Sequence, residues 1–139
     1  MAKKPSIKVG VEITEEAIKG LLCCAFEGGS NDWYRIEKYK YGPGLSAKDF
    51  AEDGGKFQGQ TYWHPCQLVP LVKGCAVIIA DMEAGGKKYS LDREALTKGL
   101  VVMAKDQPLH FGNFISERDD ATTGDVFLQC CLFGEVLYG

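Results

Sequence analysis

Two aromatic segments contain the side chains with the clearest potential for ligand binding. The first is "AFEGGSNDWYR", residues 25–35, and the second is "TYWHP", residues 61–65. Aromatic rings stack on the faces of bases, and an arginine makes charge-assisted hydrogen bonds to phosphate. A pocket for a nucleotide-derived ligand would therefore use Asn31, Trp33, Tyr34, Arg35, Tyr62, Trp63 and His64. The alternative is that each tryptophan is a buried core residue, as large aromatic residues often are.

Histidine chemistry is limited to His64 and His110, the two histidines of the chain. His64 is close in sequence to Cys66 and could serve it as a general base. The sequence has no phosphate-binding loop and no serine, histidine and aspartate order typical of a hydrolase. We therefore expect a binding protein and assign no catalytic residue.

The six cysteines occur mainly in apolar helical patterns, as in "LLCCAF" and "LQCCLF". Without an export signal, this placement predicts reduced thiols rather than disulfides. A zinc site built from His64, Cys66 and Cys75 is the alternative. The chain lacks a CxxC pair, and adjacent cysteines on a helix point about 100° apart, which disfavours a shared ion. We expect neither a metal nor a cofactor.

The composition indicates one globular domain over residues 1–139. Hydrophobic residues make up 45% of the chain and charged residues 25%, which is enough apolar material for one core. The formal net charge of −3 lacks the basic excess typical of proteins that bind duplex nucleic acid. No apolar run approaches the ~20 residues that span a bilayer, and no signal peptide is apparent. We expect a cytoplasmic protein that binds neither duplex nucleic acid nor a membrane.

The N-terminal third predicts a strand, a helix and a second strand. Apolar residues alternate with polar ones over residues 7–13, which is typical of a half-buried strand. Thr14 is placed to cap a helix that ends near Glu27, with Gly28 or Gly29 as its C-cap. Residues 33–41 then have the composition of a strand. Strict alternation would place Trp33, Arg35, Tyr39 and Tyr41 on one face of that strand and Tyr34 and Ile36 on the other.

The remaining residues predict a loop, a hairpin and further helices. Residues 42–60 contain five glycines and indicate a long surface loop with one helical turn. Residues 75–91 predict a hairpin that turns near Gly85, and Asp92 should cap the helix that follows it. A short helical segment is expected over residues 109–115. The last helix begins near Asp120 or Ala121.

The expected fold class is α+β, a small antiparallel sheet with about three helices packed on it. The last helix has an apolar arc from Val126 to Leu137 that is too wide for a helix exposed on one side. Such a helix is buried in the chain or packed against a partner. We therefore predict a homodimer or higher homo-oligomer, formed through this helix or through the hydrophobic edge of the sheet.

Three segments resemble a group of small uncharacterised proteins from phage and prophage genomes. They are "LLCCAFEGGSNDWYRI", "YSLDREALTKGLVVMAKDQPLHFGNFI" and the C-terminal "DDATTGDVFLQCCLFGEVLYG". The shared features are the "AFEGG" helix end followed by aromatic residues and an "LFGEVLYG"-like C-terminus. The resemblance weakens between residues 42 and 73, and the paired cysteines stand where aliphatic residues are expected. It implies a phage origin and a small accessory product, and it assigns no site residue.

Two functions follow as hypotheses from this resemblance and the aromatic segments. One is a counter-defence protein that binds and sequesters a nucleotide-derived immune signal of the host without catalysis. The other is an inhibitor that binds a host defence protein directly through an apolar surface, in the manner of anti-CRISPR proteins. Native mass spectrometry of protein from infected cells would separate the two, because it detects a small bound ligand or a protein partner.

Overall fold

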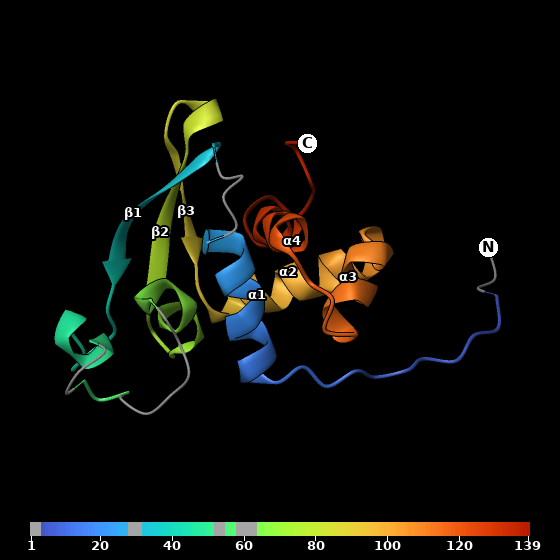
Figure 1. The fold of residues 1–139 in the computed structure, drawn as a ribbon, viewed down its shortest axis with the longest axis horizontal. Coiled ribbons are helices and arrows are strands. Elements are labelled where there is room, and N and C mark those ends of the chain that lie inside the picture. The colour runs from blue at the N-terminus through green and yellow to red at the C-terminus, as the bar shows by residue number, and fades with distance from the viewer. Residues whose placement is uncertain (1–3, 28–31, 52–54, 58–63) are drawn as a thin grey trace.

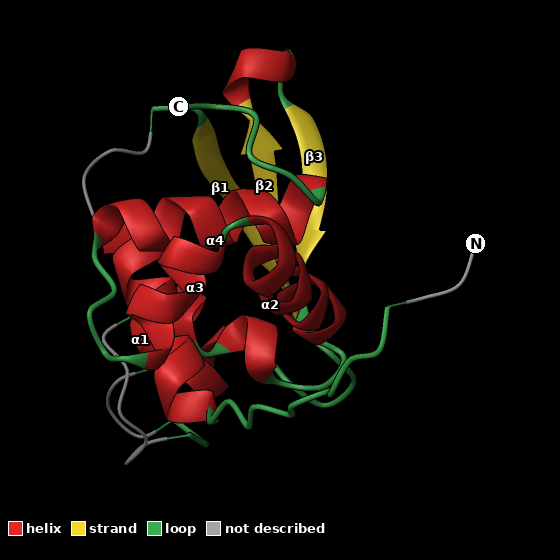
Figure 2. Cartoon of the chain, turned by 90° about the vertical axis from the view of Figure 1, so that its right-hand side faces the viewer, coloured by secondary structure: helices red, strands yellow, loops and turns green. Residues whose placement is uncertain are grey.

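The computed structural model describes residues 4–27, 32–51, 55–57 and 64–139. Its three-stranded antiparallel sheet has the order β1-β2-β3, comprising β1 (Tyr34–Lys40), β2 (Ala76–Asp81) and β3 (Lys87–Leu91). Four α-helices lie on one face of this sheet, as Figures 1 and 2 show: α1 (Glu15–Glu27), α2 (Arg93–Asp106), α3 (Pro108–Ile115) and α4 (Ala121–Phe133). The predicted α+β fold class is confirmed.

Side-chain caps fix the starts of three helices where the sequence places them. The Thr14 hydroxyl accepts a hydrogen bond from the backbone N–H of Ala17 at 3.1 Å. Asp92 caps α2 and Asp120 caps α4 in the same way, each through a 2.9 Å bond from the N–H three residues later. These bonds satisfy backbone donors that have no partner inside the helix. The predicted helix starts are confirmed, whereas the C-cap proposed at Gly28 or Gly29 lies outside the described residues.

The predicted first strand, residues 7–13, is wrong. These residues are extended, but they pair with no strand in the described part of the chain. Ile7 and Val9 have exposed fractions of 92% and 83%. Alternation of apolar and polar residues is a local property, whereas a strand also needs a neighbour that accepts its hydrogen bonds. We call residues 4–13 the N-terminal arm; Figure 1 shows it running from the start of α1 away from the sheet.

A β-bulge in β1 changes which side chains face the helices. The register of β1 against β2 shifts between Ile36 and Lys38. Because a bulge inserts one residue, it reverses the faces of the residues that follow it. Tyr39 consequently packs on the core together with Tyr34 and Ile36. The predicted separation of Tyr39 from Tyr34 and Ile36 is wrong for this reason.

The hairpin has the predicted location. A short 3-10 helix, Met82–Ala84, and two glycines with positive φ, Gly85 and Gly86, connect β2 to β3. Residues 42–51 contain one further 3-10 helix, Ala47–Phe50. The Phe50 ring is fully buried against Tyr41 and Phe57, so this part of the loop is anchored to the body of the protein.

Helix α4 is the central helix of the structure and lies against both α1 and α2. Most of its residues, including Val126, Phe127, Cys130 and Cys131, are buried. The apolar arc is therefore covered within the chain as far as α4 extends, whereas Leu137 beyond the helix is exposed. Two glycines permit the close packing: a Cβ on Gly124 would overlap the backbone of Ala25 in α1, and a Cβ on Gly99 would overlap Cys131.

Gly124→Ala should destabilise the protein by about 1–3 kcal/mol, because overpacking forces α1 and α4 apart. Gly20→Ala is the matched control, since Gly20 is exposed on α1 and its Cβ would meet no atom within 4 Å. That control should leave stability unchanged or raise it by roughly 0.4–1 kcal/mol. Urea unfolding measures both, and equal midpoints for the two variants would contradict the close helix contact.

Candidate functional site

Trp33, the first aromatic candidate, is a core residue. Only 5% of its surface is exposed, and its ring packs on Tyr34, Phe133 and Tyr138 with centroid distances of 5.0–5.5 Å. The indole Nε1 donates a 2.7 Å hydrogen bond to Oδ1 of Asp125 in α4. Both the face and the polar edge of the indole are therefore used inside the protein.

The other described candidates do not converge on Trp33. The Tyr34 hydroxyl donates to the carbonyl of Ala25 at 3.1 Å, at the end of α1. Nε2 of His64 lies 3.2 Å from a carboxylate oxygen of Glu27, near the same end of α1. The Arg35 side chain is 61% exposed and bonds to Glu37 at 2.6 Å. Asn31, Tyr62 and Trp63 lie outside the described residues. Within the described part of the chain, Trp33 and Arg35 do not line a common pocket.

A buried polar network joins α4 to the C-terminal residues and to β2. The fully buried Gln129 accepts hydrogen bonds from the N–H groups of Leu137 and Tyr138, both at 2.8 Å. Its amide nitrogen donates to Asp125 and to the carbonyl of Tyr138. The Tyr138 hydroxyl donates to Oδ2 of Asp81 at 2.8 Å. Each polar group in this network has a partner within the chain, so the network positions the C-terminus rather than forming an open binding site.

The thiols of Cys24, Cys66 and Cys130 are not activated as nucleophiles. All six are free thiols. Burial raises the pKa of Cys66 to about 12 and that of Cys130 to about 11. Burial and the nearby Asp119 carboxylate raise the pKa of Cys24 to about 11. Because the thiolate is the reactive form, these side chains behave as small apolar residues. Among the described residues, no cluster of three His, Cys, Asp or Glu side chains could hold a metal ion.

The face of the sheet opposite the helices carries four exposed cationic side chains. We call this surface the cationic sheet face and define it by Arg35, Lys38, Lys40 and Lys88. Arg35 and Lys88 both pair with Ala80, and Lys38 and Lys40 pair with Ile78 and Ala76. The residues of β2 on this face are buried, as expected where the aliphatic stems of long side chains extend over them.

Glu37 is the one acidic residue of β1 and β3. A hydrogen bond from Arg35, assisted by the charges of Arg35 and Lys88, lowers the pKa of its carboxyl group. The cationic sheet face thus retains a positive excess, although the net charge of the whole chain is −3. This face was not predicted from the sequence. The signal was present in "RIEKYKY" and "KKYSL", but the bulge is needed to bring Lys38 and Lys40 to the same side as Arg35.

A recess of about 350 Å³ lies at one end of the cationic sheet face. Its lining contains three positively charged residues, Lys40, Lys73 and Arg93, and two negatively charged residues, Asp92 and Glu94. The guanidinium of Arg93 already forms hydrogen bonds within the chain. It donates to the carbonyl of Leu71 at 2.8 Å and to a carboxylate oxygen of Glu15 at 3.1 Å. The recess is therefore polar and of mixed charge.

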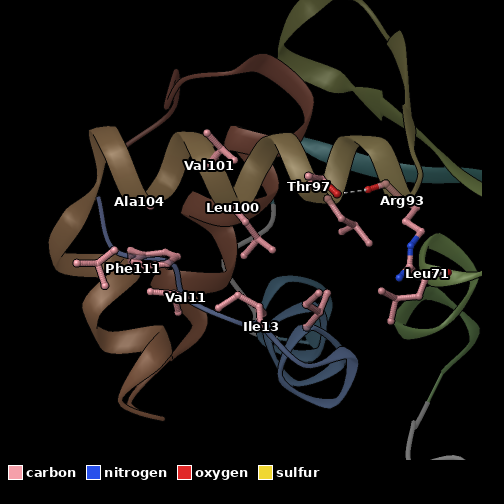
Figure 3. A pocket seen from close by; sticks show the side chains of 12 residues that line it. Val11, Ile13, Leu71, Arg93, Thr97, Leu100, Val101, Ala104 and Phe111 are labelled. Carbon is pink, nitrogen blue, oxygen red and sulfur yellow. Dashed lines mark hydrogen bonds between the residues drawn. The ribbon is translucent and has the colours of Figure 1, made fainter. Parts of the chain in front are cut away.

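An apolar groove of about 580 Å³ lies between the N-terminal arm and α2. Figure 3 shows Leu100 and Val101 of α2, Phe111 of α3 and Val11 of the arm around it. Arg93 and Thr97 are its polar lining residues. The residues that line the groove differ from those that pack on Trp33, where ligand binding was expected.

Comparisons of the chain with protein-family models, with curated proteins and with solved structures gave no match. Within the described residues, no helix combines the length and apolar character that a membrane span requires.

Stability should fall as the pH rises from about 10 to 12, because the folded state raises the pKa of several tyrosines, among them Tyr39 and Tyr138. The hydrogen bond to Asp81 raises the pKa of Tyr138 to about 12, and burial raises that of Tyr39 to about 12. In the unfolded chain both should titrate near 10, so their contribution is complete below pH 10 and is lost as the pH approaches 12.

Tyr138→Phe should lower stability at neutral pH and reduce the decline between pH 10 and 12, since one of the tyrosines with a raised pKa no longer titrates. Urea unfolding at a series of pH values measures both effects. A decline as steep as that of the parent protein would count against the Tyr138–Asp81 bond.

Proposed function

We propose that the protein is a non-catalytic binding protein and that the cationic sheet face docks on an acidic surface of another protein. The observation that carries this proposal is the concentration of exposed positive charge on β1 and β3 of an otherwise acidic chain. Complementary charge accelerates encounter and selects the partner. The buried thiols and the enclosed polar network favour binding over catalysis.

The composition of this face favours a protein partner over nucleic acid. Proteins that bind single strands present aromatic rings on which bases stack. The sheet tyrosines Tyr34, Tyr39 and Tyr89 instead pack on the core, on the helix side. Four cations and one carboxylate are also few for a duplex, whose binding depends on many phosphate contacts.

This proposal develops the second hypothesis, an inhibitor of a host protein, and moves the contact surface from an apolar patch to a charged one. With the resemblance to phage and prophage proteins, the partner would be a host defence protein with an acidic surface, and the binding protein would serve in counter-defence. Such inhibitors act by occupying a surface, so they need a stable scaffold rather than reactive groups.

The double variant Lys38→Glu/Lys88→Glu should bind acidic protein surfaces at least about tenfold more weakly, which corresponds to ~1.4 kcal/mol. A fluorescein-labelled polyglutamate peptide is the probe, and anisotropy at low and high salt is the measurement. Binding by the parent protein should weaken with added salt, because screening reduces the attraction. The matched control is Lys48→Glu/Lys105→Glu, which changes two exposed lysines of other elements by the same charge.

Equal affinity of the two double variants, or no binding by the parent protein, would contradict the proposal. Single-stranded poly(U) RNA is the comparison ligand. Tighter binding of this RNA than of polyglutamate would shift the assignment to nucleic acid.

A second candidate is sequestration of a small nucleotide-derived anion in the polar recess beside this face. The observation in its favour is the convergence of Lys40, Lys73 and Arg93. A phosphate there would gain charge-assisted hydrogen bonds, each contributing about 1.5–3 kcal/mol. The base would lack an aromatic platform from Trp33, which is enclosed in the core.

Calorimetric titration with cyclic nucleotides and ADP-ribose tests this candidate. Lys73→Ala should weaken binding by roughly tenfold or more through loss of one charge-assisted contact, whereas Lys48→Ala should leave it unchanged. Absence of heat with every ligand would eliminate sequestration of these ligands.

A further inference from the structure

The N-terminal arm has the properties of a strand without a partner. In the described part of the chain, its backbone N–H and C=O groups form no hydrogen bonds. Its apolar side chains are solvent-exposed at Ile7, Val9 and Val11. Extended backbone with free hydrogen-bonding groups and alternating apolar residues readily pairs with another strand.

The sequence of the arm is self-complementary about Gly10. In "IKVGVEI", residues 7–13, antiparallel pairing with an identical segment places Gly10 opposite Gly10. Val9 then lies opposite Val11, and Ile7 lies opposite Ile13. On the other face of the ribbon, Lys8 lies opposite Glu12. Each unlike pair occurs twice because the two strands are related by a two-fold axis.

We propose that two copies of this chain form a homodimer by antiparallel pairing of their N-terminal arms, with Gly10 at the two-fold axis. Every cross-strand pair is then apolar with apolar or positive with negative, which is the arrangement that stabilises antiparallel strands. A register shifted by one residue would place apolar residues on opposite faces, so the pattern also specifies the register.

The apolar groove explains why the pairing would be stable. A two-stranded ribbon alone is marginal in water and needs an apolar surface against one of its faces. Val9, Val11 and Ile13 already line the groove, together with Val101 and Phe111. Because all apolar residues of the ribbon lie on one face, the arm of the second copy adds its apolar side chains to the same side. The second copy therefore covers surface that is exposed in the monomer, including Val101, which is 62% exposed.

The other surfaces considered for self-association fit less well. The apolar arc of α4 is covered by α1 and α2. The edge strand β1 carries Arg35, Lys38 and Lys40, so two identical β1 edges would oppose like charges. The arm alone combines opposite charges in a symmetric order. This inference does not depend on the proposed function, because the cationic sheet face lies on other elements.

Charge exchange within the arm tests the proposal. Lys8→Glu places carboxylates opposite each other at both charged pairs, and Glu12→Lys places two ammonium groups opposite each other. Each single variant should dimerise about tenfold more weakly than the parent protein in sedimentation equilibrium. The double variant Lys8→Glu/Glu12→Lys should recover the parent affinity, since every pair is again of opposite charge. Lys48→Glu is the control for the change in net charge and should dimerise like the parent.

Mixing the two single variants provides the most specific measurement. In the mixed dimer each negative arm faces a positive arm, so heterodimers should form more tightly than either homodimer. Native mass spectrometry distinguishes the species after isotope labelling of one variant. Three results would each overturn arm pairing. They are a parent protein that is monomeric at high micromolar concentration, single variants that dimerise as tightly as the parent, and a statistical mixture of dimers.

Discussion

The close packing of α4 between α1 and α2 is the constraint on which the rest of the structure depends. Gly124 brings α4 against the backbone of α1, and Gly99 brings α2 against α4. Helices normally pack with axes 8–10 Å apart, and smaller separations require residues without side chains at the crossing. With α4 in this position, its polar residues Asp125 and Gln129 lie where they can bind Trp33 and the C-terminal residues.

The hydrogen bonds of Asp125 and Gln129 determine which surfaces of the molecule remain open. Asp125 holds the indole of Trp33, and Gln129 holds the backbone around Tyr138. Tyr138 in turn reaches Asp81 at the end of β2. Buried polar groups that are fully paired rigidify the elements they join. The helix side of the sheet is thus closed at this end.

Features encoded by neighbouring residues could be predicted from the sequence. The caps at Asp92 and Asp120 and the hairpin turn at Gly85 depend on a few adjacent residues, and all three are present. The strand predicted for residues 7–13 failed because pairing depends on a partner that alternation does not reveal. Trp33 and Arg35 were separated because Trp33 precedes β1 and its indole bonds to Asp125 of α4. Burial of this kind depends on residues more than ninety positions away.

The positions of the charged residues distinguish the edge strands of the sheet from the N-terminal arm. Lysines on edge strands hinder edge-to-edge pairing, because like charges meet when two copies approach. The edge strands β1 and β3 follow this rule, with five cationic residues between them. The arm does not follow it, since its one lysine and one glutamate between Ile7 and Ile13 are symmetrically placed about Gly10. Like charges at the sheet edges disfavour pairing of two copies there. This supports the proposal that the arm pairs with a second copy and that the outer face of the sheet binds an acidic partner.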